Sequence, residues 1–116
     1  MLWLFSGDAP IYSQLIEQIS RGIVSGVFPP GERLPSVRDL ATEAGVNPNT
    51  MQRALTELER DGLVYSQRTA GRFVTEDKAM IETAKRALAE RHITAFLDAM
   101  TRLGYQREEV INMLRQ

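Results

Sequence analysis

The sequence contains no cysteine and only one histidine, His92, among its 116 residues. A chain without cysteine can form neither a disulfide nor a thiolate site. A single histidine makes a metal site built from protein ligands, or a histidine-dependent catalytic triad, difficult to assemble. No catalytic pair of carboxylates and no phosphate-binding loop can be recognised either. These absences argue against an enzyme, and we expect no cofactor.

Long apolar runs are also missing, since none approaches the ~20 residues that a membrane span needs. The apolar stretch at residues 2–5 is too short for the core of a signal peptide, and no basic residue precedes it. Apolar residues at 43% and charged residues at 25% are typical of a globular protein. We therefore expect a cytoplasmic protein without a membrane partner, with one domain and a small appendix.

Acidic residues are absent from two segments of a chain whose net charge is −1. In residues 45–56 the only charged side chain is Arg53, and in residues 62–75 the only ones are Arg68 and Arg72. The electrostatic potential around these segments is therefore expected to be neutral or positive. A negatively charged partner such as nucleic acid is compatible with this distribution, although few basic side chains are available to contact phosphates.

Two helices are expected in the first part of the chain. Apolar residues recur at helical spacing over residues 11–25, which predicts the first helix. The second is expected over residues 37–44, because Ser36 stands three residues before Asp39, the spacing of a capping box. Gly45 supplies the left-handed residue that ends it. A Gly-containing turn then leads to a third helix.

The third helix is expected to begin at Asn47 and Pro48, because asparagine caps a helix well and proline fits its first position. Its apolar residues, expected to face inward, are Met51, Ala54, Leu55 and Leu58. Its polar residues, expected to face outward, are Asn49, Thr50, Gln52, Arg53 and Thr56. The Asp-Gly pair at residues 61–62 ends the helix.

Two short β-prone runs, at residues 63–66 and 72–75, follow the third helix and predict a hairpin whose loop carries Arg68. Helix, turn, polar helix and hairpin in this order are typical of a winged helix-turn-helix, which places one helix in the DNA major groove. The predicted fold is mainly α with a small β-hairpin, the wing. Residues 1–76 are expected to form this DNA-binding domain.

Residues 77–116 are expected to form a helical dimerisation appendix. A long helix over residues 77–103 carries an apolar stripe, and a short helix over residues 107–114 follows, with Leu114 among its inward residues. A small domain cannot cover such a stripe, so we expect the same helix of a second copy to cover it. Folding back onto the first helix is the alternative. The expected dimerisation residues are Ile81, Ala84, Leu88, Ala95, Phe96, Ala99 and Leu103.

Amide, hydroxyl and guanidinium groups gather where a winged helix meets DNA. Asn or Gln can pair with adenine, Arg with guanine, and Thr can contact a thymine methyl or a phosphate. The DNA contacts expected from these side-chain types are Arg38, Asn47, Asn49, Thr50, Gln52, Arg53, Arg68 and Arg72. Ordinary surface roles are the alternatives: Arg53 could pair with Glu57, and Arg38 with Glu32 or Asp39.

Several motifs within residues 10–76 resemble the N-terminal domain of GntR-family transcriptional regulators. They are Pro-Ile-Tyr at 10–12, Pro-Pro-Gly at 29–31, Leu-Pro-Ser-Val-Arg-Asp-Leu-Ala at 34–41, Val-Asn-Pro-Asn-Thr at 46–50, Ala-Leu-Thr-Glu-Leu-Glu at 54–59, Asp-Gly-Leu-Val at 61–64 and Gly-Arg-Phe-Val at 71–74. The resemblance implies a homodimer that binds double-stranded operator DNA, usually to repress transcription. By position it implies DNA contacts at Arg38, Asn47, Asn49, Thr50, Gln52 and Gly71.

The chain departs from the family pattern at Pro48 and Gln52, where many members carry arginine, so the direct guanine contacts of those arginines are not carried over. The Asn-Pro-Asn-Thr variant and a C-terminal region of about two helices resemble the YtrA-like subfamily. We therefore expect a regulator that binds a palindromic operator. A winged-helix adaptor that binds protein is the alternative, which the polar, acid-free third helix disfavours. Nothing in the sequence identifies a small-molecule effector.

Overall fold

The first helix of the helix-turn-helix, α2 (Val37–Ala44), has the bounds that the sequence predicts in the structure, a computed structural model that describes residues 1–116. The Ser36 hydroxyl accepts a hydrogen bond from the Asp39 amide at 3.1 Å. Only this one of the two hydrogen bonds of a capping box forms, because the Asp39 carboxylate does not accept from the Ser36 amide. Gly45 ends α2 at φ 71°, in the left-handed region.

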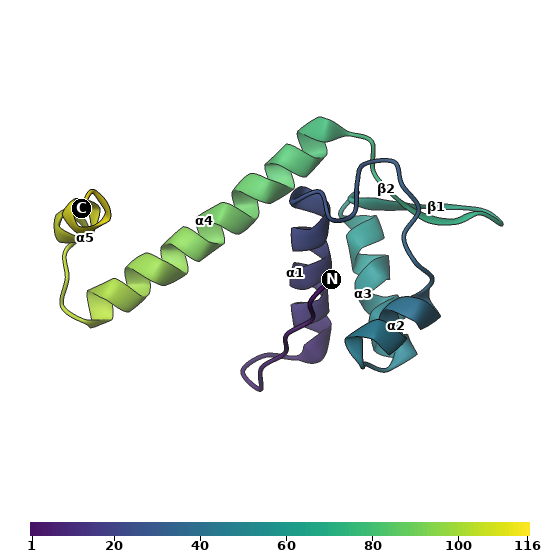
Figure 1. Cartoon of the computed structure of the whole chain (residues 1–116), viewed down its shortest axis with the longest axis horizontal. Helices are drawn as coiled ribbons and strands as arrows, with labels where there is room; N and C mark the ends of the chain where they lie inside the picture. The colour runs from purple at the N-terminus through teal and green to yellow at the C-terminus, as the bar shows by residue number, and fades with distance from the viewer. The chain divides into compact units, whose positions relative to one another are not determined.

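The second helix, α3 (Pro48–Arg60), begins as predicted, with the Asn47 side chain accepting from the Asn49 amide at 2.7 Å. It packs side by side with α1 (Ile11–Val24), as Figure 1 shows. Its buried residues are the four that the apolar spacing predicts, Met51, Ala54, Leu55 and Leu58. The inner face of α3 is therefore anchored, and its outer face stays available.

The hairpin consists of the antiparallel strands β1 (Val64–Gln67) and β2 (Gly71–Val74). Each strand lies one residue closer to the turn than predicted, because Gln67 pairs with Gly71 and leaves a shorter loop. This hairpin is the wing that the sequence predicts after the third helix. The predicted fold class, mainly α with one small hairpin, is confirmed.

One hydrophobic core joins α1, α2, α3 and the wing. Its buried members are Leu15, Ile19, Ile23, Leu34, Leu40, Ala41, Met51, Ala54, Leu55, Leu58, Leu63, Val64 and Val74. Full burial of one such leucine, isoleucine or valine side chain stabilises a fold by roughly 1.5–3 kcal/mol. Because four of these residues belong to α3, the core fixes the orientation of that helix.

The N-terminal arm, residues 3–5, packs on the winged domain itself. The indole Nε1 of Trp3 donates to Glu43 Oε1 on α2 at 3.1 Å. The Leu4 amide donates to Gln18 Oε1 at 3.0 Å, and Gln18 Nε2 donates back to the Leu4 carbonyl at 2.6 Å. These bonds satisfy the buried Gln18 amide of α1 and hold the arm in place.

The chain divides into two compact units, Met1–Lys85 and Arg86–Gln116, and the division falls within α4 (Lys78–Arg102). No residue of α4 is fully buried. In the second unit, α5 (Arg107–Leu114) occupies its predicted range and buries Val110. The expectation that Leu114 faces inward is wrong. Leu114 is 69% exposed, because it is the last residue of α5, one turn beyond the buried Val110. None of the helices combines the length and apolar character that crossing a membrane requires.

Candidate nucleic-acid interface

The N-terminal half of α3 presents the polar side chains that the sequence predicts as base contacts. Asn49, Gln52 and Arg53 are exposed, and Thr50 is half-buried. Asn47 is exposed too, but its Oδ1 is occupied as the helix cap, so its amide nitrogen is the group left to donate. This surface can therefore both donate and accept hydrogen bonds at base edges.

The guanidinium of Arg53 lies over the ring of Tyr12 on α1, with 4.0 Å between Cζ and the ring centroid. The alternative pair with Glu57 does not form, because Glu57 binds Arg60 at 2.7 Å. Stacking on the ring face leaves the N–H groups at the guanidinium edge free to donate. Tyr12 therefore orients Arg53, a role that the sequence did not reveal because the two residues lie on different helices.

Arg72, on β2, faces α3. Its Nε donates to Glu59 Oε1 at 2.8 Å, and its Nη1 donates to Gln52 Oε1 at 3.3 Å. The Ser66 hydroxyl on β1 donates to the same Glu59 oxygen. Both strands of the wing are thus tied to α3. The sequence predicts a direct DNA contact for Arg72, which stays a prediction, while the structure adds a positioning role.

The hydrogen bond from Ser66, and then that from Arg72, lower the pKa of the Glu59 carboxyl below its usual value of 4.5, although burial opposes them. Because the pKa is lower in the folded state, these contacts stabilise the fold above about pH 4.5 and lose their contribution as the pH falls through the folded pKa. When the pH is lowered from about 6 to 3, the free energy of unfolding of Glu59→Gln is expected to fall by less than that of the native protein. Urea unfolding at each pH measures this difference.

The matched control for this pH dependence is Glu108→Gln, an exposed carboxylate on α5 without a hydrogen-bond or ionic partner. It removes one carboxylate and leaves the hydrogen bonds of Glu59 in place. An identical profile for Glu59→Gln and the native protein would contradict a stabilising role for the Glu59 carboxylate.

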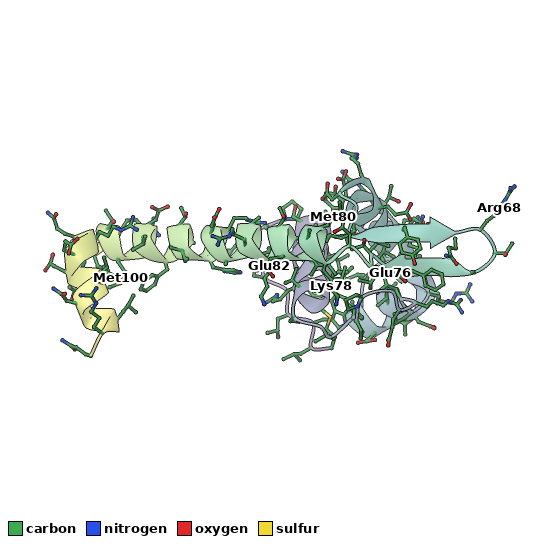
Figure 2. The ribbon with its side chains drawn as sticks, turned by 90° about the horizontal axis from the view of Figure 1, so that it is seen from above. Arg68, Glu76, Lys78, Met80, Glu82 and Met100 are labelled. Carbon is green, nitrogen blue, oxygen red and sulfur yellow. The ribbon has the colours of Figure 1, made fainter.

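Two arginines predicted to meet DNA have unpaired guanidinium groups. Arg38 on α2 is exposed, and neither of its alternative partners, Glu32 and Asp39, engages it. Arg68 stands at the tip of the wing with its side chain pointing away from the strands, as Figure 2 shows. Both groups are free to contact a phosphate.

Gly71 begins β2 and lies beside Arg33, a residue to which the sequence assigns no role. It adopts φ 109°, and a Cβ at this position would lie 2.9 Å from Nε of Arg33. Arg33 itself forms an isolated antiparallel bridge with Phe73. Arg33, Ser36, Gly71 and Arg72 contribute to the lining of a hollow of about 210 Å³, so the start of α2 and the wing lie together. Gly71 is therefore required for its backbone conformation, whereas the flexible Arg33 side chain could move to make space for a Cβ.

The predicted dimerisation residues divide between the two units. Ile81 and Ala84 are half-buried against the core of the first unit. In the second unit Leu88 is half-buried. The exposed members of the set are Ala95, Phe96, Ala99 and Leu103. A dimer contact through α4 would therefore use its second half more than its first.

Residues 11–74 match the family described as "Bacterial regulatory proteins, gntR family". The chain belongs to the GntR family. This GntR protein is 38% identical over 96 residues to the HTH-type transcriptional repressor YtrA of Bacillus subtilis (strain 168). The alignment covers 83% of the chain and 69% of that repressor. The resemblance to YtrA-like GntR regulators is thereby confirmed.

Solved structures share the fold over different lengths. A GntR family transcriptional regulator from Listeria monocytogenes has a TM-score of 0.87 and 39% identity, and the match covers 96% of this chain and 97% of that one. AraR(DBD) in complex with operator ORX1 has a TM-score of 0.59 and 32% identity, covering 65% of this chain and 96% of that one. The GntR protein is a winged-helix transcription regulator and not an enzyme. No group of three acidic or histidine side chains could hold a metal ion.

Proposed function

We propose that this GntR protein is a sequence-specific repressor that binds a palindromic operator as a homodimer. One observation carries the proposal: the exposed, acid-free polar half of α3 is anchored through its buried face and lies beside an arginine-bearing wing. A recognition helix in the major groove requires this arrangement. The crystal structure of AraR(DBD) with an operator and the name of YtrA as a repressor support it.

In this proposal the side chains of α3 contact base edges, and arginines on neighbouring elements hold the DNA backbone. Asn49, Thr50 and Gln52 stand in the first two turns of α3, the part that enters the groove. Arg38 and Arg68, whose guanidinium groups are unpaired, contact phosphates on either side. Base contacts then specify the sequence, and phosphate contacts position the domain.

A protein-binding adaptor would be expected to expose an apolar patch on the outer face of α3. Asn49, Gln52 and Arg53 occupy that face instead. The large exposed apolar side chains lie elsewhere, mainly in residues 1–11 and 80–114. The composition of the α3 surface therefore favours nucleic acid as its partner.

The second half of α4 exposes an apolar row that a second copy of the chain would cover. Ile93 and Phe96 are 56% and 43% exposed, and their i, i+3 spacing places them on one face of the helix. Leu103, 72% exposed, directly follows the last residue of α4. The alternative, folding back within the chain, accounts for Ile81 and Ala84, which pack on the core, but not for the exposed Phe96. Two-fold pairing would present two α3 helices to half-sites about one DNA turn apart.

The proposal divides the chain into residues 1–76, which bind DNA, and residues 77–116, which dimerise. Selection of bound duplexes from a random pool by the full-length protein tests both parts. Recovery of two symmetric half-sites is the expected result. A protein that selects no sequence would refute the proposed function, and a single unpaired half-site would refute the dimeric arrangement.

Arg38→Ala and Gln52→Ala are expected to weaken binding in different ways. Loss of a phosphate contact should weaken binding to operator and scrambled duplex alike and lower the slope of log K against log salt by about one. Loss of a base contact should cost ~1–3 kcal/mol of discrimination at one base pair. Anisotropy titrations with both duplexes at several salt concentrations measure these effects.

Two further variants serve as controls for the DNA contacts. Arg21→Ala removes the same charge as Arg38→Ala from an exposed site on α1 outside the predicted interface. Thr56→Ala changes an exposed residue of α3 beyond the predicted base contacts. Both should bind like the native protein. Equal losses on operator and scrambled duplex for Gln52→Ala would contradict its assignment to a base.

A further inference from the structure

The hydrogen bonds between the wing and α3 determine which way the Gln52 amide is turned. A guanidinium can only donate, so the Gln52 group 3.3 Å from Arg72 Nη1 is the carbonyl oxygen, Oε1. Arg72 is itself held by Glu59, which accepts from its Nε at 2.8 Å and also from the Ser66 hydroxyl. The amide nitrogen of Gln52 is therefore the group left to meet a base.

This orientation matters because a glutamine normally recognises adenine through both of its amide atoms. The nitrogen donates to adenine N7, and the oxygen accepts from adenine N6. In this chain the oxygen of Gln52 already accepts from Arg72, and the Arg72 N–H groups beside it compete with a second donor such as adenine N6. Guanine presents two acceptors, N7 and O6, in the same places.

We propose that Gln52 and Arg72 together form a donor-only surface that selects guanine at one operator position. Gln52 donates from its amide nitrogen, and the N–H groups of Arg72 that Glu59 and Gln52 do not use reinforce the preference for acceptors. Glu59 is a positioning residue, because it acts through Arg72. The inference rests on the proposed function, in which α3 lies in the major groove.

The test compares four duplexes that differ only at the base pair where Gln52→Ala loses discrimination in the random-pool selection. The native protein should bind guanine over adenine at this position by about tenfold. Arg72→Lys keeps the charge, but an ammonium lacks the planar fork that holds Glu59 and Gln52 at once. We expect Arg72→Lys to reduce the preference to about threefold or less.

Arg68→Ala is the matched control, because Arg68 belongs to the same wing but has no partner on α3. It should weaken binding to all four duplexes equally and keep the guanine preference. Should Arg72→Lys fail to fold by circular dichroism, Arg72→Met replaces it. Native preference for adenine, or a folded Arg72 variant that still prefers guanine tenfold, would overturn the inference and leave the proposed function intact. A native protein that selects no sequence at all would overturn both.

Discussion

Phe96→Arg is expected to convert the proposed homodimer into monomers and to weaken operator binding by about 100-fold or more. Phe96 is 43% exposed on α4, so an arginine there has access to water in the single chain. At a two-fold contact the same substitution would bury two like charges without partners, which opposes association. A monomer holds only one half-site and loses the avidity that the second half-site provides.

Light scattering reports the oligomeric state of this variant, and anisotropy with the selected operator reports its affinity. Thr94→Arg is the matched control, since two residues turn a helix by about 200° and place Thr94 on roughly the opposite face from Phe96. Thr94 is exposed, and its replacement should leave a dimer of native affinity. A Phe96→Arg protein that remains dimeric would show that the exposed apolar row of α4 is not the contact.

Leu58→Ala is expected to lower the free energy of unfolding by about 2–5 kcal/mol. Leu58 is 0% exposed in the core that joins α3 to the rest of the winged domain. Its truncation removes buried apolar surface and leaves a cavity that closely packed neighbours cannot fully close. Because the orientation of the outer face of α3 depends on this anchoring, operator affinity should fall at temperatures near the thermal unfolding transition of the variant. Urea and thermal unfolding measure the loss.

Thr56→Ala changes the same helix on its exposed face and should alter stability by no more than about 0.5 kcal/mol. The contrast between the two variants separates the anchoring side of α3 from its exposed side, which is proposed to face DNA. Similar, small effects for both would mean that the core under α3 contributes little to the fold.

The helix-turn-helix could be predicted closely because its signals are local. Ser36, Gly45, Asn47 and Pro48 each act on backbone groups within a few residues, and their effect does not depend on distant parts of the chain. The apolar spacing of α3 identified its buried face for the same reason. The strands of the wing begin and end one residue closer to the turn than predicted, because strand ends depend on cross-strand pairs such as Gln67 with Gly71.

The candidate interface could be predicted as a set of residues but not as a set of interactions. The sequence offered Glu57 as the partner of Arg53 because i, i+4 is the spacing of helical neighbours. The structure placed Tyr12 under Arg53, and Arg60 beside Glu57. Nothing in the spacing of the sequence shows that Arg33 lies beside Gly71.

The sequence by itself determined where helices begin and end, which face of each is apolar, and that acids are missing where DNA is expected to lie. Those properties follow from neighbours a few residues apart. Only the tertiary structure decided that Arg72 reaches Glu59 and Gln52, residues 13 and 20 positions away. The core brings β2 against α3, and hydrogen-bond partners across that contact depend on distance and direction in space, which no local pattern encodes.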